Sequence, residues 1–391
     1  MSHSLKAGTT LEIAIDAVAH GGDGVGRVGE LVCFVSGALP GDVVRARIYR
    51  LGKRAVWARL LAVVSPSPHR MLDSVCDGPA CASACVWHAF AYPAQGAWKQ
   101  RIVSETLARL GHVTAEVAFQ ETPGLRLGYR TRATFHGDGQ RIGYYAQRTH
   151  DVISLSSCPL NHPHLNDALE ALHPLGVKGD VHVTVNPEGD EKLLWMRHPG
   201  DPVRAAFPMA NVMTDAERHR FFFDGVPIVN GAFSQSSLLL NRMLRRETDA
   251  CIGQADSLLD LYCGNGNLSL HHAATAEVVG VDHAGPAVET ANALGAGDYR
   301  RGDEAVMVSL IEERSWEVII LDPPRVGAAS LMEALAAART NAIVYVSCNP
   351  ATLARDLHVL CSHGWNLIRT TAIDMFPHTP HIESVCLLRR Q

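Results

Sequence analysis

The sequence of 391 residues lacks several features that would assign it to a broad class at once. No apolar run reaches the ~18 residues that a membrane-spanning helix needs. The first ten residues are polar and lack the apolar core of a signal peptide. Internal repeats and low-complexity segments are also absent. We therefore expect a cytoplasmic protein, and nothing in the sequence indicates a membrane or an obligate protein partner.

An excess of positive charge is also missing, because the formal net charge is −5. This disfavours a wholly basic nucleic-acid-binding protein, although an RNA-binding surface needs only local positive charge. Basic residues do cluster in two stretches. One holds Arg45, Arg47, Arg50, Lys53, Arg54 and Arg59, and the other holds Arg126, Arg130, Arg132, Arg141 and Arg148.

The length and the 47% hydrophobic content predict two or three globular domains. Short alternating segments in residues 5–64 predict a small OB-like β-barrel, with residues 21–26 as a glycine-rich loop. We place domain boundaries so that the barrel spans 1–66 and a central mixed α/β domain spans 67–227. The third domain, 228–391, alternates strands with helices, which predicts a Rossmann-like, doubly wound parallel sheet and an overall α/β class.

The elements expected in this last domain follow from apolar runs and helical spacing. The predicted helices cover 238–249, 285–294, 329–339 and 350–361. The predicted strands cover 257–262, 278–282, 317–321, 342–347, 365–374 and 383–389. Two earlier helices are expected at 94–111 and near 165–172.

A nucleotide-like cofactor is indicated where the strand at 257–262 runs into a Gly-x-Gly turn at 264–266. Glycines let the backbone approach a ligand, and ligands bind at the carboxyl ends of strands in such sheets. Asp282 ends the next strand, about 20 residues later, where it can accept hydrogen bonds from a ribose. These features alone do not separate NAD from S-adenosylmethionine.

Two further strand ends carry reactive groups. The Asp-Pro-Pro-Arg motif at 322–325 directs Asp322 into the cleft, because prolines fix the backbone and remove N–H donors. The motif favours transfer to a ring carbon over transfer to an amine. Cys348 stands where a buried strand meets a helix, and a helix N-terminus lowers the pKa of a thiol. We interpret Cys348 as a nucleophile, and Glu383, after the Pro-rich loop that also carries His381, as a general base.

Cysteines form a separate cluster before the first predicted helix. Cys76, Cys81 and Cys85, with the distant Cys158 before a proline, suit a [4Fe–4S] cluster. Zinc is the alternative, although structural zinc sites more often show paired short spacings. A third interpretation is that these four cysteines are free thiols that bind no common metal or cluster.

Taken together, these motifs resemble the RNA uracil-5 methyltransferases, and within them the branch that acts on 23S ribosomal RNA. The motifs are Asp-x-Tyr-Cys-Gly-x-Gly-Asn, Asp-Pro-Pro-Arg, Ser-Cys-Asn-Pro-x-Thr and His-x-Glu, in this order. Residues 5–64 resemble a TRAM domain, an RNA-binding barrel, and the resemblance covers essentially the whole chain. It implies RNA as partner, and S-adenosylmethionine and an iron–sulfur cluster as cofactors.

The resemblance also implies roles for individual residues. The S-adenosylmethionine site would be lined by Gln235, Tyr262, Asn267, Asp282, Asp303 and Asp322. Three positions depart from the family pattern: the cluster cysteines are separated by four and three residues instead of five and two, Ser237 replaces an asparagine, and Asp282 replaces a glutamate.

Uracil C5 is a poor nucleophile, and addition of the Cys348 thiolate to C6 would place electron density on C5. Asp322 and Arg325 would orient the uracil edge, and Glu383 would later remove the C5 proton. The alternatives are a tRNA uridine-C5 methyltransferase, an enzyme acting on cytosine or on an amine, and an RNA-binding protein with an inactive catalytic fold.

Overall fold

The structure is a computed structural model that describes residues 5–71, 73–76, 85–122, 124–146, 149–211 and 219–390. As far as they are described, residues 1–102 and 376–381 form one compact unit, and residues 103–375 and 382–391 form a second. No helix within the described ranges is both long and apolar enough to cross a membrane. The domain boundaries at 66 and 227 remain a prediction.

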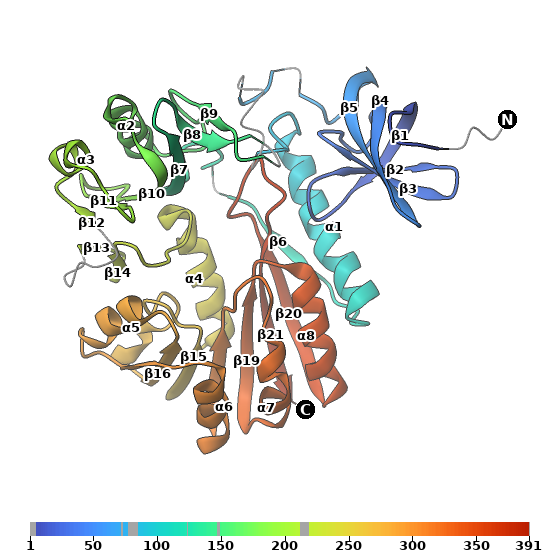
Figure 1. Ribbon diagram of the computed structural model, residues 1–391. Helices are drawn as coiled ribbons and strands as arrows, with labels where there is room; N and C mark the ends of the chain where they lie inside the picture. The colour runs from blue at the N-terminus through green and yellow to red at the C-terminus, as the bar shows by residue number, and fades with distance from the viewer. Residues whose placement is uncertain are drawn as a thin grey trace. The chain divides into compact units, whose positions relative to one another are not determined.

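Five strands of the first unit close into the predicted barrel, in the order β1-β2-β3-β5-β4 (Figure 1). In β4, Val44, Ala46 and Ile48 are buried in the barrel core, and the residues between them are exposed. This confirms the alternation that the sequence predicted. The strand bounds are Thr10–Val18 (β1), Gly24–Val28 (β2), Leu31–Ser36 (β3), Val43–Leu51 (β4) and Ala55–Ser65 (β5).

The expectation of a loop throughout residues 21–26 was wrong, because β2 begins at Gly24. The glycines serve close packing instead. A Cβ atom on Gly26 would lie 2.2 Å from the carbonyl oxygen of Ala14 in β1, and one on Gly24 would lie 2.6 Å from that of Ala38. Glycine inside a strand often marks such a close approach of two backbones.

The second unit contains a six-stranded sheet in the order β12-β11-β10-β7-β8-β9. Helix α2 (Pro163–Leu172) packs against β7, β8 and β10 through a shared apolar core that includes Phe135, Leu165 and Val183. The strands are Arg132–Asp138 (β7), Ile142–Tyr145 (β8), Val152–Ser154 (β9), Lys178–Val185 (β10), Lys192–Trp195 (β11) and Ala210–Asn211 (β12). A 3₁₀ turn (His173–Leu175), α3 (Asp201–Ala206) and the hairpin of β13 (Arg220–Phe223) and β14 (Val226–Val229) complete this region.

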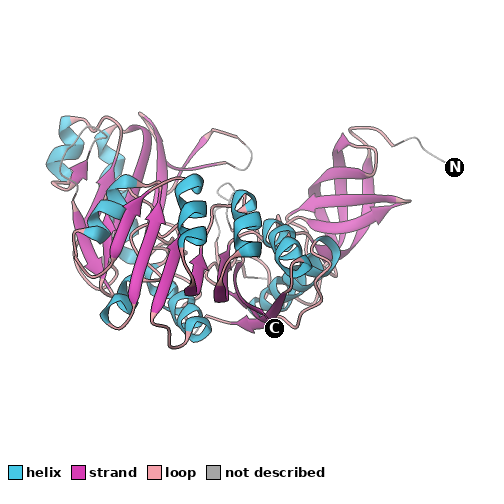
Figure 2. Ribbon diagram, turned by 90° about the horizontal axis from the view of Figure 1, so that it is seen from below, coloured by secondary structure: helices cyan, strands magenta, loops and turns pink. Residues whose placement is uncertain are grey.

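The larger sheet of the second unit has eight strands in the order β17-β16-β15-β18-β19-β21-β20-β6. Strand β21 runs antiparallel to its neighbours β19 and β20, and the remaining pairs are parallel. Helices lie on both faces of the sheet (Figure 2), so the predicted doubly wound architecture is confirmed. The strands are Ala118–Gln120 (β6), Ser257–Leu261 (β15), Glu277–Asp282 (β16), Asp298–Arg301 (β17), Trp316–Leu321 (β18), Thr340–Ser347 (β19), Trp365–Ile373 (β20) and Glu383–Arg390 (β21).

The helices of this region agree closely with the predicted ranges. The 329–339 helix is shorter than expected, because it opens with a 3₁₀ turn (Ala329–Leu331) and continues as α7 (Met332–Ala337). Strand β17 and helix α6 (Glu304–Glu313) were not predicted. The other helices are α1 (Tyr92–Leu110), α4 (Leu238–Ile252), α5 (Gly285–Asn292) and α8 (Pro350–Ser362), with a 3₁₀ turn at Leu270–Ala274.

Candidate active site

The proposed nucleophile and base stand at one edge of the eight-stranded sheet. Antiparallel strands β19 and β21 pair Val346 with Val385 and Ser347 with Ser384. The next step of this register brings Cys348 opposite Glu383. Residues directly opposite in an antiparallel pair point to the same face, with Cβ atoms about 5 Å apart. The reversed direction of β21 therefore places its first residue beside the end of β19.

Hydrogen bonds fasten the Asp-Pro-Pro-Arg loop to the segment that carries the nucleophile. The carbonyl oxygen of Arg325 accepts hydrogen bonds from Asn349 Nδ2 at 2.9 Å and Thr352 Oγ1 at 3.3 Å. Further along the loop, Asp356 Oδ2 accepts from the Ala328 N–H at 2.9 Å and from the Tyr345 hydroxyl at 2.6 Å. Nothing in the sequence pointed to the Asp356 network, yet it holds the Asp322 loop against β19 and α8.

Two carboxyl groups at this edge have strongly shifted pKa values. Burial raises the pKa of Glu383 well above its usual range, and the nearby Asp322 carboxylate adds to the shift while Arg325 opposes it. Burial likewise raises the pKa of Asp322 to about 7, with a contribution from Asp282. Clusters of perturbed carboxyls are typical of sites that bind cations or move protons.

The expectation of a lowered thiol pKa at Cys348 was wrong. Burial raises the pKa of Cys348 to about 11, the Glu383 and Asp322 carboxyls act in the same direction, and Arg325 opposes them. Asn349, not Cys348, caps α8, since its Oδ1 accepts the N–H of Ala351 at 3.1 Å. The thiol therefore lies one residue outside the position where the helix dipole acts most strongly.

Three carboxylates stand at the ends of the adjacent strands β16, β15 and β18. Asp282 and Asp322 lie at the same level on either side of Tyr262, because Leu261 pairs with both Val281 and Leu321. Asp282 accepts the N–H groups of Gly264 at 3.0 Å and Ala284 at 2.8 Å, so it fixes the glycine turn.

Asp260, a member of the motif but not among the predicted site residues, is the third carboxylate. Its Oδ2 accepts a hydrogen bond of 2.5 Å from Ser269, whereas its buried Oδ1 has no hydrogen-bond partner among the described residues. Burial raises the pKa of Asp260 to about 7, with contributions from Asp322 and Asp282 against the Ser269 hydrogen bond. The signal for it was already in the sequence, as the acid that opens the Asp-x-Tyr motif.

The predicted cofactor residues in the turn after β15 have distinctive backbone or side-chain settings. Tyr262 has a φ of 61°, a strained conformation for a residue with a side chain. Asn267 exchanges two hydrogen bonds with Asn241 of α4, at 2.7 and 3.0 Å. Asn241 was not predicted, and it ties the turn to the first turn of α4.

Two other predicted cofactor residues lie at helix starts. Asp303 is exposed and caps α6, accepting the N–H groups of Ala305 and Val306 at 3.1 and 3.2 Å. Gln235 is half-buried in the loop before α4. Ser237, at the position where the family pattern has asparagine, caps α4 by accepting the N–H of Leu240 at 3.0 Å.

Of the four predicted cluster ligands, Cys76 and Cys85 belong to the first unit and Cys158 to the second, and Cys81 lies outside the described residues. Cys76 is half-buried, and Cys85 and Cys158 are buried. Ser74 links the segment that carries Cys76 to the segment that carries Cys85. Its Oγ donates to the carbonyl oxygen of Cys76 at 2.8 Å and is hydrogen-bonded to His88 Nδ1 at 2.6 Å. His88 in turn donates its backbone N–H to the carbonyl of Cys85.

The barrel presents a basic and aromatic surface. Arg47 of β4 lies opposite Arg59 of β5, and both are exposed. Arg50 lies 4.1 Å above the ring of Trp57, which stacks on Phe34 with ring centroids 5.8 Å apart. Cationic and aromatic side chains in this arrangement suit contacts with phosphates and bases.

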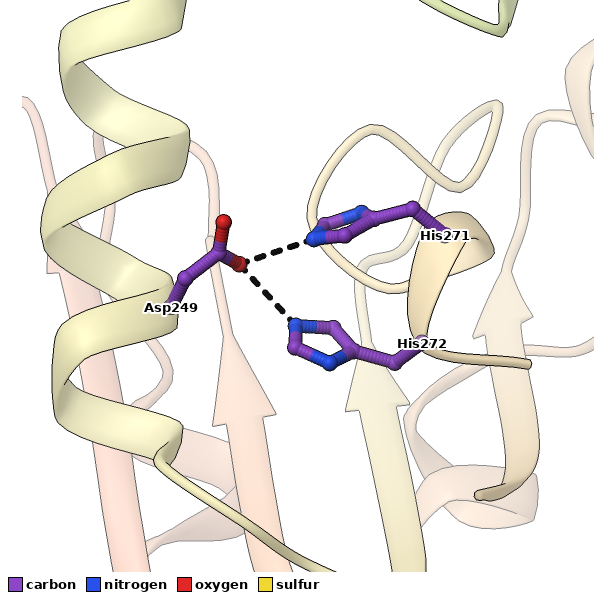
Figure 3. Close-up of side chains that lie close together, drawn as sticks. All are labelled: Asp249, His271 and His272. Carbon is purple, nitrogen blue, oxygen red and sulfur yellow. Dashed lines mark hydrogen bonds and ion pairs between the residues drawn. The ribbon is translucent and has the colours of Figure 1, made fainter. Parts of the chain in front are cut away.

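A group of two histidines and one aspartate lies outside the predicted site (Figure 3). His271 Nε2 and His272 Nε2 each lie 2.9 Å from Asp249 Oδ1. Arg245 donates to His271 Nδ1 at 3.2 Å, so the neutral ring carries its proton on Nε2 and donates it to Asp249. These bonds join α4 to the 3₁₀ turn at Leu270–Ala274, and the positive guanidinium of Arg245 would repel a metal ion bound there.

Family models match both ends of the chain. Residues 301–391 match the model described as tRNA (Uracil-5-)-methyltransferase, and residues 5–61 match the TRAM domain. The chain is 31% identical to the 23S rRNA (uracil(1939)-C(5))-methyltransferase RlmD of Pseudomonas entomophila, over 98% of this chain and 94% of that protein. It is also 31% identical to an uncharacterized RNA methyltransferase of Gloeobacter violaceus, over 99% of this chain and 98% of that protein.

Similarity to a solved structure extends over the whole fold. The tRNA (uracil-54, C5)-methyltransferase of Pyrococcus abyssi, solved in complex with S-adenosyl-L-homocysteine, superimposes with a TM-score of 0.76. The two chains are 22% identical, and the match covers 96% of this chain and 99% of the other. The predicted combination of a barrel with a methyltransferase fold is thereby confirmed.

Proposed function

Because this chain belongs to the family of S-adenosylmethionine-dependent RNA uracil-5 methyltransferases, we propose that it methylates C5 of one uridine in 23S rRNA through a covalent adduct of Cys348. The observation that carries this proposal is the register that sets Cys348 opposite Glu383, with Asp322 and Arg325 close to both. A thiol, a base and a cation near the end of one strand suit addition of the thiolate to a pyrimidine ring.

The residues at the strand ends suit a cationic cofactor. Asp260, Asp282 and Asp322 interact electrostatically, and two of them have pKa values near 7. A positively charged ligand would relieve their mutual repulsion, whereas the pyrophosphate of a dinucleotide would increase it. S-adenosylmethionine carries a positive sulfonium and supplies an electrophilic methyl group when bound. We propose that Gln235, Tyr262, Asn267, Asp282, Asp303 and Asp322 hold it.

The protein's own groups would act in three stages. Cys348 must first release its thiol proton to solvent, which the Arg325 guanidinium favours and which burial and the two carboxyls oppose. The thiolate then adds to C6 of the uracil, and the electron pair of the C5–C6 double bond moves toward the C4 carbonyl and makes C5 nucleophilic. After C5 is methylated, Glu383 removes the C5 proton, the double bond re-forms and the Cys348 sulfur leaves.

The target base must leave its stack to reach this edge of the sheet. The exposed arginines and Trp57 of the barrel suit contacts with the surrounding RNA. The names of the relatives support uracil 1939 of 23S rRNA as the target. The name of the Pyrococcus abyssi enzyme makes tRNA uracil 54 the second candidate.

A [4Fe–4S] cluster ligated by Cys76, Cys81, Cys85 and Cys158 remains a proposal from the cysteine pattern. Thiolates are the usual ligands of such clusters, and two of the described cysteines are buried as cluster ligands commonly are. No step of the proposed reaction runs through the cluster. Iron and sulfide content of anaerobically purified protein, compared with zinc content, tests the proposal, and Cys158→Ala should lower the iron content.

A trapping experiment tests the covalent mechanism. RNA fragments that carry 5-fluorouridine at the position of 23S uracil 1939, or of tRNA uracil 54, are incubated with the enzyme and S-adenosylmethionine. Fluorine cannot leave as a cation, so the thioether adduct should persist on the ribosomal fragment. A denaturation-resistant complex that disappears in Cys348→Ala supports the mechanism. Absence of the complex with both RNAs, while the cofactor still binds, would contradict it.

A further inference from the structure

The six-stranded sheet has one face against α2 and a second face of a different character. Thr134, His182 and Trp195 lie directly opposite one another in β7, β10 and β11, so their side chains share one face. His136 lies on the same face, two residues after Thr134. We call the half-buried side chains of Thr134, His136, Tyr145, His182 and Trp195 the open face.

At one end of the open face, two flat rings are held in parallel. The rings of His136 and Tyr145 stack with centroids 3.6 Å apart and an interplanar angle of 9°. His136 Nδ1 bonds to Asp180 at 2.7 Å, which fixes its ring. Gly143, opposite His136, has no side chain to compete for this space, and a Cβ there would lie 2.0 Å from the carbonyl oxygen of Ile153. The stacking and the Asp180 bond therefore hold the two rings parallel.

At the other end, Trp195 lies against His182 with ring centroids 5.1 Å apart. His182 Nδ1 is paired with the Thr134 hydroxyl at 2.9 Å. The indole N–H of Trp195 is buried without an acceptor among the described residues. A buried donor without an acceptor costs stability, so the indole N–H itself does not stabilise the fold.

The open face continues to the loop that leads to Gln235. Arg132, two residues before Thr134 on the same face, donates to the carbonyl oxygen of Ala232 at 2.8 Å and to the hydroxyl of Ser234 at 3.1 Å. These acceptors carry no charge, so they do not neutralise the guanidinium. Burial lowers the pKa of Arg132 to about 10, which still leaves it cationic at neutral pH. The exposed ring of Phe233 lies beside it, with 5.6 Å between the guanidinium and the ring centroid.

From this arrangement we propose that the open face binds single-stranded RNA adjacent to the target uridine, with unpaired bases stacking on the Tyr145–His136 pair and on Trp195. The inference rests on the proposed function and adds to it a binding site for flanking nucleotides. Proteins read single-stranded RNA mainly by stacking its bases on aromatic and histidine rings. The charge of Arg132 would attract the backbone between the open face and the Gln235 loop, because phosphates are anionic.

The test compares variants that lose a stacking ring with control variants that keep both rings. Tyr145→Leu and Trp195→Leu remove the stacking rings. Tyr145→Phe is a control that keeps the ring and loses only the hydroxyl. Ile368→Ala is a second control, at an exposed apolar residue of β20 that is 57% accessible. Fluorescence anisotropy measures binding of a labelled fragment of 23S rRNA that spans uracil 1939, at several salt concentrations. Calorimetry of S-adenosylmethionine binding shows that each variant is folded.

We expect each leucine variant to weaken RNA binding about tenfold, as for the loss of one stacked base. The dependence of affinity on salt should not change, because stacking releases no counterions. Tyr145→Phe and Ile368→Ala should bind RNA as the parent does. Parent-like RNA affinity in both leucine variants, in an enzyme that still forms the 5-fluorouridine adduct, would overturn the open-face proposal alone. A parent enzyme that binds none of this RNA would overturn the proposed function as well.

Discussion

Cys348 and Glu383 are 35 residues apart in the chain, yet the pairing of Ser347 with Ser384 places them opposite each other at the edge of one sheet. This arrangement depends on the antiparallel insertion of β21 between β19 and β20. If β21 ran parallel to β19, its first residue would lie beside the first residue of β19, at the opposite end of the strands from Cys348. The reversed strand is therefore what gives the nucleophile a neighbouring base.

Replacing the nucleophile should abolish turnover and leave the fold intact. We expect Cys348→Ser to lower the methylation rate by several orders of magnitude, since a hydroxyl does not form the anion that adds to C6. Methyl transfer to the rRNA fragment, measured with a radiolabelled donor, gives the rate. Cys361→Ser, at another half-buried cysteine of the same segment, is the control and should retain parent activity. Substantial turnover in Cys348→Ser would contradict the covalent mechanism.

Replacing the base should separate addition from elimination. In Glu383→Gln the thiolate can still add, but the C5 proton has no acceptor, so turnover should fall by about 10²–10⁴. A covalent complex should then accumulate even with ordinary uridine, visible as a shifted band on a denaturing gel. If the variant releases methylated RNA at the parent rate, Glu383 is not the base.

Asp260 should make the parent protein less stable at neutral pH than at acidic pH. Its pKa is about 7 in the folded protein and near 4 when unfolded. The folded state thus holds the proton more tightly, and this stabilisation is complete below pH ~4 and disappears as pH rises through ~7. The contribution is on the order of 4 kcal/mol. Urea unfolding at pH 5 and pH 8 measures how much unfolding free energy is lost as the pH rises. This loss should be smaller for Asp260→Asn than for the parent, and equal losses would show that Asp260 does not have a raised pKa.

Asp42 should have the opposite pH dependence in the barrel. Its buried carboxylate accepts hydrogen bonds from Arg70 at 2.6 Å and from the N–H groups of Ser67 and Leu39. Burial alone would raise its pKa, but these partners outweigh it and lower the pKa. The stabilisation is therefore present above pH ~4 and lost as pH falls through the lowered pKa.

Asp42→Ala should cost about 3–5 kcal/mol at pH 7, because it leaves Arg70 half-buried without its partner. Asp298→Ala, which breaks an exposed pair with Arg300, should cost about 1 kcal/mol or less. Thermal or urea unfolding measures both variants. Equal effects would show that burial does not strengthen the Asp42 pair.

Local patterns in the sequence predicted most of the fold. The helices at 238–249 and 350–361 and the strands at 342–347 and 383–389 agree with α4, α8, β19 and β21 to within three residues. Strand β17 was missed because Asp-Tyr-Arg-Arg has a single apolar residue, and its pairing with β16 decides its structure. Similarly, Gly24 and Gly26 suggested a turn, because the close packing that requires them involves Ala14 and Ala38, outside the local segment.

The site was predictable where it depends on residue type and strand ends, and unpredictable where it depends on packing. The sequence indicated Cys348, Glu383 and Asp322 without showing their proximity, which follows from the strand order. It suggested the wrong direction for the pKa of Cys348, because burial and the neighbouring carboxyls outweigh the Arg325 guanidinium. The bonds between Asn241 and Asn267 join segments 26 residues apart, and no motif announces them.

Strand β6, only three residues long, has a consequence for any attempt to isolate the catalytic region. Ala118–Gln120 pairs in parallel with Thr371–Ile373 of β20 and covers that strand's edge. A fragment beginning near residue 228 would keep the nucleophile and the base but lose this cover. The uncovered backbone of β20 would then act as a template for pairing with other chains. Excised in this way, the catalytic sheet would tend to aggregate, so a productive truncation has to retain the chain from residue 118 onward.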